Sequence, residues 1–382
     1  MQKDIQKKPR LLIVSDSALC MGMNKKVYAF EPVLRELENI SNMFDKITWI
    51  GYGKCQENLI KNMRENNEKN IEFIILKKTG GRNILKKIGI LLKMPPYFFL
   101  IKKNILEHDI IHTRAPSMPA FLAIVISFFD RERIYWHKYA GDWTTPIAPP
   151  FYRLQRALLK RARHTHVTIN GKWPGQQKHI LSFENPCLTK REYLQAKESG
   201  KNRSFDGKLN FCFIGNLNDD KGVGKIIEAF AGLKHSKIGS IHFIGDGAQR
   251  EEYEKASENI PAVFHGFLLR AEMEQLLPRM HFLLLPSRSE GFPKVIAEAA
   301  AYGTIPVVSA ISSIPQYIRD GENGFLLESI DVESLRSTLH YVLSLPADTL
   351  KKISKNTLMI PENFTYEYFA SRIKKDILGE KT

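Results

Sequence analysis

Apolar and polar positions alternate along the chain with two different periods. Short apolar runs bounded by turn residues predict buried strands, and longer stretches with apolar residues every three or four positions predict helices. The runs that predict strands are 11–15, 47–52, 71–76, 109–114, 133–137, 165–169, 209–214, 240–247, 262–267, 282–285 and 305–308. The stretches that predict helices are 25–37, 77–104, 121–129, 225–233, 293–302, 331–345 and 366–378. This alternation is typical of α/β domains with parallel sheets.

The clearest pattern lies at 281–309, where two apolar strands flank an Ala-rich helix. Pro293 stands where that helix would begin, a position at which its missing N–H costs nothing. Gly303 stands where the helix would end. Because the helix should be largely buried, its charged residues Lys294 and Glu298 need partners.

Two carboxylates flank the start of this helix. Side chains on a helix lean toward its N-terminus, so Glu298 points back to the turn that carries Glu290. A helix N-terminus binds anions, and carboxylates accept hydrogen bonds from hydroxyls. A ligand with an anionic middle and hydroxyl-rich ends, such as a nucleoside diphosphate sugar, fits both properties. The alternative is that Glu298 forms a buried ion pair and Glu290 caps the helix.

The string S-x-x-E-G-F-P-x-V-x-x-E-A-x-A-x-G-x-x-P-V-V at 287–308 resembles the E-x7-E signature of retaining glycosyltransferases. These are GT-B enzymes of the glycogen-synthase-like group, which includes enzymes of bacterial surface-polysaccharide synthesis. The resemblance implies an α/β chain with two Rossmann-like domains whose parallel sheets face a central cleft. It also implies that Glu290 is a catalytic residue facing the donor sugar and that Glu298 binds the ribose. The other donor-binding residues that it implies in this string are Gly291, Phe292, Pro293 and Lys294.

A second motif lies at 215–222, where GNLNDDKG resembles the family's G-R-L-x-x-x-K-G loop. The resemblance implies that Gly215 and Lys221 border the donor diphosphate and that Lys221 neutralises its charge. Asn216 stands where the family has arginine, so the donor-binding loop has one cation fewer than expected. Lys294, in the first turn of the central helix, is positioned to compensate.

Weaker resemblances assign further residues to the two sides of the cleft. The segment 262–267 resembles the part of the family whose loop lies beside the nucleotide base, which adds Gly266 and Phe267 to the donor site. Gly22 matches the glycine of the family's first loop, on the acceptor side. An ordinary turn glycine is an equally good interpretation of Gly22.

Family members often carry a sugar-contacting histidine near the end of a strand in the first domain, and the register here is ambiguous. In one alignment Ala140 occupies the histidine position and leaves Asp142 as the polar group. In the other, His137 fills the role. Both His137 and Asp142 are therefore candidate catalytic residues, although a lone histidine near a strand end is more often structural.

The chain has 382 residues, enough for two domains. The segment 191–207 is polar, charged and without apolar periodicity, which predicts a linker. It would separate an acceptor-side domain at 1–190 from a nucleotide-sugar-binding domain at 208–362. The family resemblance implies that 363–382 is a helix that crosses back to the first domain.

The net charge of +15 is unevenly distributed. Residues 1–200 contain 34 Lys and Arg against 18 Asp and Glu, or +16, whereas residues 201–382 contain 22 against 23, or −1. This asymmetry predicts an anionic partner for the first half. Within it, 77–104 sets lysines around apolar and aromatic residues, which is typical of a basic helix lying on a membrane. Packing of that helix on the sheet is the alternative. Nucleic acid is not expected, because no nucleic-acid-binding motif accompanies the charge.

The first residues, MQKDIQKKPR, have no apolar signal core, and the longest apolar runs, such as 121–129, are too short to span a bilayer. These features predict a soluble, cytoplasmic chain, peripheral at the cytoplasmic face of the membrane. The cysteines form no C-x-x-C pair and have no zinc-like spacing with histidine, which predicts reduced cysteines without a metal. They are Cys20, Cys55, Cys187 and Cys212.

Motifs and resemblance together predict a retaining hexosyltransferase that moves a sugar from a nucleotide-diphosphate donor to a glycan or lipid-linked acceptor in cell-surface polysaccharide biosynthesis, such as that of lipopolysaccharide. No D-x-D motif stands in a credible loop and the family needs no divalent metal, so neither a metal nor a cofactor beyond the nucleotide sugar is expected. The alternatives are a nucleotide-sugar epimerase of the same fold and a non-catalytic glycan- or membrane-binding relative. A Rossmann oxidoreductase is disfavoured, because G-x-G-x-x-G is absent after the first strand.

Overall fold

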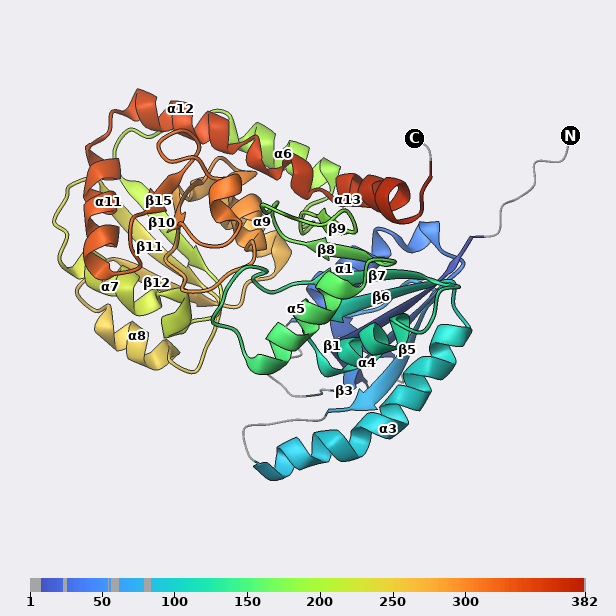
Figure 1. The fold of residues 1–382 in the computed structure, drawn as a ribbon. Helices are drawn as coiled ribbons and strands as arrows, with labels where there is room; N and C mark the ends of the chain where they lie inside the picture. The colour runs from blue at the N-terminus through green and yellow to red at the C-terminus, as the bar shows by residue number, and fades with distance from the viewer. Residues whose placement is uncertain (1–7, 23–25, 54, 56–61, 79–83, 381–382) are drawn as a thin grey trace, which may run out of the picture. The chain divides into compact units, whose positions relative to one another are not determined.

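The computed structural model describes residues 8–22, 26–53, 55, 62–78 and 84–380, with the backbone alone for 84–92. The chain forms two compact units (Figure 1), of which the first consists of Met1–Phe183 and Ala370–Thr382 and the second of Glu184–Phe369. Each unit is built on one mainly parallel sheet with helices, which confirms the predicted class of two Rossmann-like α/β domains.

The first unit alternates strands and helices. Its strands are β1 (Arg10–Met21), β2 (Val27–Phe30), β3 (Lys46–Gly53), β4 (Met63–Glu65), β5 (Ile71–Lys77), β6 (Ile110–Ala115), β7 (Ile134–Tyr139), β8 (His166–Ile169) and β9 (Ile180–Ser182). Its helices are α1 (Glu31–Glu38), the 3₁₀ turn η1 (Ser41–Met43), α3 (Ile84–Leu106), α4 (Met118–Ser127) and α5 (Pro150–Arg161). The last helical elements of the described chain are α13 (Tyr366–Arg372) and the π-helical turn η6 (Ile373–Ile377).

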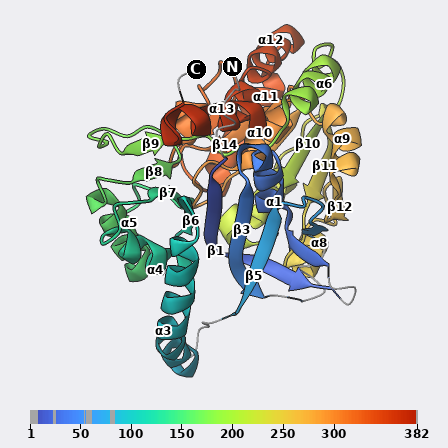
Figure 2. The same ribbon diagram turned by 90° about the vertical axis from the view of Figure 1, so that its right-hand side faces the viewer.

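Strand β1 lies at the centre of the first sheet. The parallel strands run in the order β5-β3-β1-β6-β7-β8-β9, and β2 and β4 add antiparallel pairs beside the end of β1. Figure 2 shows β1, β3 and β5 side by side. Parallel strands buried on both faces need continuous apolar sequence, which Leu12 and Val14 supply. These residues share a buried cluster with Tyr97 and Ile101 of α3 and Leu122 of α4.

The predicted helix at 25–37 is wrong in its first part. The end of β1 pairs with β2 in an antiparallel hairpin, with Leu19 opposite Ala29, and α1 begins only at Glu31. The four apolar and aromatic residues of β2 are too few to distinguish the two periods, so the pairing with an unexpectedly long β1 decides the outcome. Gly22 therefore lies in a hairpin turn, where its N–H donates to the carbonyl of Lys26 at 2.8 Å.

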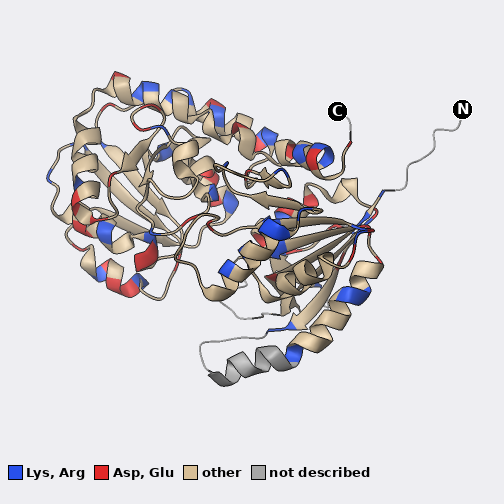
Figure 3. Ribbon diagram, in the orientation of Figure 1, with Lys and Arg blue, Asp and Glu red and all other residues tan. Residues whose placement is uncertain are grey.

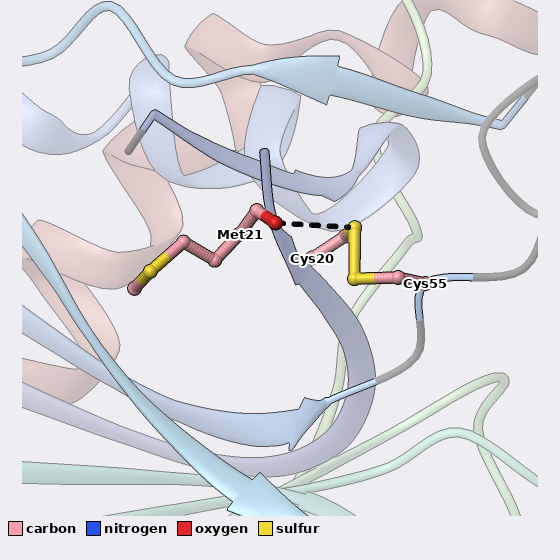
Figure 4. Close-up of a disulfide and its surroundings, with 3 residues drawn as sticks. All are labelled: Cys20, Met21 and Cys55. Atoms are coloured by element: carbon pink, nitrogen blue, oxygen red, sulfur yellow. Dashed lines mark hydrogen bonds between the residues drawn. A yellow bond between two sulfur atoms is a disulfide. The ribbon is translucent and has the colours of Figure 1, made fainter. Parts of the chain in front are cut away.

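The prediction that all four cysteines are reduced is also wrong. Cys20 and Cys55 form a disulfide with their Cα atoms 5.0 Å apart (Figure 4), whereas Cys187 and Cys212 are free and buried. The pairing follows from the register of β1 with β3, because Leu19 lies opposite Gly53 and the two cysteines come just after these partners. Sequence spacing could not reveal it, since the cysteines are 35 residues apart and outside any local motif.

The second unit is a doubly wound α/β domain. Its strands are β10 (Leu209–Ile214), β11 (Ile238–Ile244), β12 (Ala262–Gly266), β13 (Phe282–Leu285), β14 (Ile305–Ser309) and β15 (Phe325–Leu327). Its α-helices are α6 (Lys190–Gly200), α7 (Val223–Ala231), α8 (Arg250–Ala256), α9 (Arg270–Leu276), α10 (Lys294–Ala300), α11 (Val332–Ser344) and α12 (Ala347–Thr357). Shorter 3₁₀ turns are η2 (Asp219–Lys221), η3 (Leu277–Arg279), η4 (Ile314–Gln316) and η5 (Ile360–Phe364).

All strands of this sheet are parallel, in the order β12-β11-β10-β13-β14-β15. The order reverses between β10 and β13, whose facing residues Phe211 and Phe282 stack with ring centroids 5.2 Å apart. In such sheets ligands bind beside the carboxyl ends of the strands at the reversal point. A ligand of this domain is therefore expected beside the loops that follow β10 and β13.

Two glycines let the loops at this edge approach one another closely. Gly245, after β11, has φ of 130°, and a Cβ built on it would lie 1.9 Å from the carbonyl oxygen of Gly215, after β10. Gly222, with φ of 78°, would place a Cβ 2.5 Å from the carbonyl oxygen of Pro286, after β13. Only glycine permits both these backbone angles and these contacts at low cost.

The polar segment expected to be a linker, 191–207, begins with a helix that belongs to the second unit. Helix α6 starts with a capping box, in which Thr189 and Glu192 exchange hydrogen bonds with each other's backbone. The hydroxyl of Tyr193 donates to the carbonyl of Leu358 at 3.0 Å. After the helix, the buried guanidinium of Arg203 donates to three carbonyls of the second unit. The capping box and the hydrogen bonds of Tyr193 and Arg203 hold this segment in place. Because these interactions leave no apolar periodicity in the sequence, the helix was not predicted.

Candidate functional site

The loops that follow β10 and β13 meet at the reversal point of the second sheet. The backbone N–H of Arg288 donates to the carbonyl of Asp220 at 2.8 Å. Asn218 caps the 3₁₀ turn η2 by accepting from the N–H of Lys221 at 2.9 Å, which fixes the position of that lysine. In a doubly wound domain this edge forms the ligand crevice, and here two loops with defined backbones border it.

Lys221 and Glu290 form an ion pair across this crevice. The Lys221 side chain is 29% exposed and the Glu290 side chain 10% exposed, so the pair is only partly open to solvent. The sequence identified both residues but assigned them to different parts of a ligand and did not predict their contact. An ion pair half-shielded from water attracts more strongly than an exposed one, so Lys221 helps to hold the Glu290 carboxylate in place.

Glu298 lies half-buried on α10, among the buried side chains of Ile296, Ala297 and Ala299. Pro293, the predicted start of this helix, occupies its N-cap position, so the helix begins one residue later, at Lys294, and Gly303 follows it with φ of 73°. The short helix thus holds Glu298 and, in its first turn, the half-buried Lys294 near the crevice edge.

Phe292 of the signature string is a core residue. Its ring is buried, stacks on Phe364 at 4.6 Å between centroids and meets Tyr317 edge-on at 4.7 Å. The hydroxyl of Ser313 donates to the carbonyl of Gly291 at 2.9 Å. These contacts anchor the turn that carries Glu290, so Phe292 acts on the site through the backbone that it holds.

The other donor-side residues lie along the same edge of the sheet. Gly215 follows β10, and Asn216 beside it is exposed. Gly266 ends β12 with φ of 69° and its carbonyl accepts from the N–H of Gly245 at 2.8 Å. Phe267 follows it and is half-buried. The loops that follow β10, β12 and β13 therefore bring the sequence-predicted donor residues to one edge of the sheet.

Two buried hydroxyls at this edge were not predicted. Ser287 follows β13 and Ser309 ends β14, both with 0% exposure, and neither side-chain oxygen has a hydrogen-bond partner among the described residues. A buried hydroxyl without a partner costs free energy. Both serines are therefore candidates for contacts with a ligand or an ordered water. The only sequence signal was the position of Ser287 at the start of the signature string.

The two alternatives for the first-domain histidine have different environments. His137 lies inside β7 with 0% exposure, and its Nδ1 is 2.9 Å from the hydroxyl of Thr113. Burial lowers the pKa of His137 to about 3, so its imidazole is neutral at ordinary pH. Asp142 lies in the loop after β7, where one carboxylate oxygen accepts from Thr144 and Thr145. These contacts are those of a core histidine and a turn-forming aspartate, and they favour structural roles for both.

Comparisons with known proteins agree with this geometry. Residues 195–358 match the family described as glycosyl transferases group 1. The chain is 26% identical over 338 residues to the sulfoquinovosyl transferase SQD2 of Arabidopsis thaliana, covering 76% of this chain and 64% of that protein. It is 30% identical over 151 residues to an uncharacterized 41.2 kDa protein in the cps region of Klebsiella pneumoniae, covering 38% and 41%. The matches thus span less than two thirds of these relatives.

Solved structures show the same fold over nearly the whole chain. Anabaena Alr3699/HepE in complex with UDP and glucose superposes with a TM-score of 0.68 at 15% identity, covering 97% of this chain and 99% of that one. The lipopolysaccharide outer core galactosyltransferase WaaB gives 0.63 at 14% identity, covering 97% and 99%. The chain therefore has the GT-B fold. Residues 195–358, which match the group 1 glycosyltransferase family, carry Lys221, Glu290 and Glu298.

Proposed function

We propose that this protein is a retaining glycosyltransferase that uses a nucleotide-diphosphate sugar as donor. The observation that carries the proposal is the ion pair of Lys221 with Glu290 at the reversal point of the second sheet, inside the matched family region. A lysine and a carboxylate on two fixed loops offer a cation to a diphosphate and an acceptor to sugar hydroxyls. The partial burial of the pair strengthens both interactions.

Each residue then has a defined role. Lys221 and the backbone N–H groups near Gly291 offset the charge of the leaving diphosphate, so no divalent metal is needed. Glu298 accepts hydrogen bonds from the ribose hydroxyls. Glu290 faces the donor sugar, where positive charge develops as the glycosidic bond to the diphosphate breaks.

The acceptor is proposed to be a glycan or a lipid-linked sugar of a cell-surface polysaccharide. Its support comes from the names of relatives, one from a cps region and one a lipopolysaccharide galactosyltransferase. Among the described residues, no helix is both long and apolar enough to cross a membrane. A lipid-linked acceptor of this kind would lie at the cytoplasmic face of the membrane, so we propose that the protein meets it there as a peripheral protein.

A panel of UDP-, GDP- and ADP-sugars, followed by thermal unfolding, tests the donor class. A ligand that binds only the folded chain raises the free energy of unfolding by about 2.7 kcal/mol at 100 times its dissociation constant. One nucleotide should stabilise the protein and the others should not. A donor converted to a free sugar epimer without an acceptor would favour an epimerase instead. The absence of any stabilising nucleotide would leave a non-catalytic relative.

Glu298→Ala should weaken binding of the matching nucleoside diphosphate by about tenfold to a hundredfold. The change removes hydrogen bonds from a carboxylate to the ribose, worth about 1.5–3 kcal/mol. Titration calorimetry on the folded variant measures this affinity. Glu322→Ala is the control, because Glu322 is an exposed glutamate of the same unit. Unchanged affinity in Glu298→Ala would remove its assignment to the ribose.

Asn216→Arg should raise affinity for the nucleoside diphosphate by up to about tenfold and leave affinity for the nucleoside unchanged. Asn216 is exposed, so an arginine fits without displacing a neighbour. The added guanidinium would supply the cation that the family carries at this position, and a charge-assisted hydrogen bond contributes about 1.5 kcal/mol or more. Asn202→Arg adds the same charge away from the crevice loops and should change neither affinity. No gain for the diphosphate would indicate that Lys221, with Lys294, already supplies enough charge.

A further inference from the structure

A long segment of the first unit carries only positive charge. Residues 143–183 contain seven Lys or Arg and no Asp or Glu, although the whole chain has 41 acidic residues. Helix α5 lies within this segment, and Figure 3 shows basic but no acidic residues on it. An ordinary solvated helix mixes both signs on its outer face. This bias therefore needs a partner of opposite charge.

The outer face of α5 also exposes large apolar side chains. Leu154 is 47% exposed, and Ile147, in the loop before the helix, is 91% exposed. Phe151 is 37% exposed, and its ring packs against Phe121 with centroids 5.2 Å apart. The residues Gln155, Arg156 and Leu159 point inward and are buried. The usual pattern of a surface helix is thus partly inverted, because two polar residues are inside and a leucine is outside.

The inward polar residues fix this orientation. The guanidinium of Arg156 donates to the carbonyls of Asp142, Trp143 and Thr145 at 3.2, 2.9 and 2.7 Å. The side-chain oxygen of Gln155 accepts from the N–H of Ser117 at 3.2 Å. Because α5 is locked by these bonds, Leu154 cannot turn inward, and its exposure is a property of the folded unit.

A basic pocket of about 270 Å³ lies at the C-terminal end of α5. It is lined by Arg163, Gln177, Lys178 and His179. The imidazole of His179 is bonded to the carbonyl of Leu159 at 3.1 Å, which ties the pocket to the helix. Two cations, an amide and an imidazole around a small hollow suit a phosphate head group.

We infer that α5, with Ile147 and the basic pocket, docks the protein on an anionic phospholipid bilayer. The helix, about 18 Å long, would lie in the interface with Leu154 and the preceding Ile147 among the lipid tails and its cations at the phosphates. The inference rests on the proposed function in one respect: a lipid-linked acceptor is the reason for the protein to bind a membrane. Lipid binding itself requires no donor.

This surface differs from the one that the sequence suggested. Of the lysines in 77–104, the side chains of Lys86 and Lys87 lie outside the described residues. In the described part of α3, Tyr97 and Ile101 are buried against the sheet. The described part of α3 thus packs one face on the sheet, as the alternative has it, but it also exposes Phe99, Lys102 and Lys103. What distinguishes α5 is the basic pocket at its end.

Sedimentation of the full chain with vesicles, without nucleotide, tests the inference. Binding should need phosphatidylglycerol in phosphatidylcholine vesicles and should weaken with salt. The triple change Arg153→Gln, Lys160→Gln and Arg161→Gln should lower the partition coefficient by about a hundredfold, since each cation near an anionic leaflet contributes about fivefold. The matched control changes Lys351, Lys352 and Lys355 of α12 to Gln, which removes the same charge from exposed positions of the second unit.

Insertion is measured separately with a polarity-sensitive dye on Ile147→Cys, in a chain whose free cysteines are otherwise buried. Its emission should shift to the blue with anionic vesicles, whereas the dye on Leu269→Cys, an exposed site in the second unit, should not respond. Equal binding by the α5 triple variant and wild type, an equal loss in the control triple, or no dye shift would overturn the inference. Thermal unfolding confirms that the variants are folded. Nucleotide binding by a chain that fails to bind vesicles would leave the donor proposal intact.

Discussion

Replacing Glu290 by glutamine should lower kcat by about a hundredfold to a thousandfold, the usual effect of removing one group that stabilises developing charge. Glu290 is 10% exposed and held by Lys221, so its carboxylate has a fixed position from which to face the donor sugar. Glutamine keeps the shape and removes the charge. Affinity for the nucleoside diphosphate should not weaken, because Lys221 loses its competing carboxylate and remains available for phosphate.

Steady-state rates with the matching donor, and calorimetric titration of the nucleoside diphosphate, separate these two effects. Glu322→Gln is the control, since it neutralises an exposed carboxylate in the same unit. A parallel loss of turnover and diphosphate affinity in Glu290→Gln would indicate that Glu290 supports the loop and has no catalytic role.

Lys221→Ala should weaken binding of the nucleoside diphosphate by about tenfold to a hundredfold and leave the nucleoside almost unaffected. The lysine donates charge-assisted hydrogen bonds, worth about 1.5–3 kcal/mol, and Asn216 leaves it without the arginine expected beside it. The variant should also lose about 1–2 kcal/mol of stability, because Glu290 is left partly buried without its cation.

Arg319→Ala is the matched control for this variant. Arg319 and Glu322 form an ion pair that is largely exposed, and such pairs contribute little. Its removal should change neither diphosphate affinity nor unfolding temperature measurably. Equal loss of nucleoside and nucleoside diphosphate affinity in Lys221→Ala would show that the lysine acts through the fold of the crevice and does not bind phosphate.

The sequence predicted the parts of the fold that rest on continuous apolar runs. Phe282–Leu285 and Ile305–Ser309 are strands close to the predicted bounds, and α10 lies between them. Parallel strands buried on both faces leave a strong signal of this kind. The E-x7-E string likewise located the crevice, because its turn follows the strand next to the reversal point.

Features that depend on contacts between distant residues were not predicted. The ion pair of Lys221 with Glu290 joins loops 69 residues apart in sequence, and the Cys20–Cys55 disulfide depends on the register of two strands. Helix α6 is held by caps and buried anchors where no apolar period was visible. His137 was singled out by one of two possible alignments with the family's histidine, and the structure shows that its side chain is fully buried.

The central claim is that the crevice of the second unit binds the diphosphate and ribose of a nucleotide donor. Its most direct test is calorimetric titration of the nucleoside diphosphate selected by the donor panel into wild type, Lys221→Ala, Glu298→Ala and Glu322→Ala. Wild type and Glu322→Ala should bind equally, and the other two should bind at least about tenfold more weakly. Equal affinity in all four proteins, or no binding of UDP, GDP or ADP by the wild type, would contradict the account.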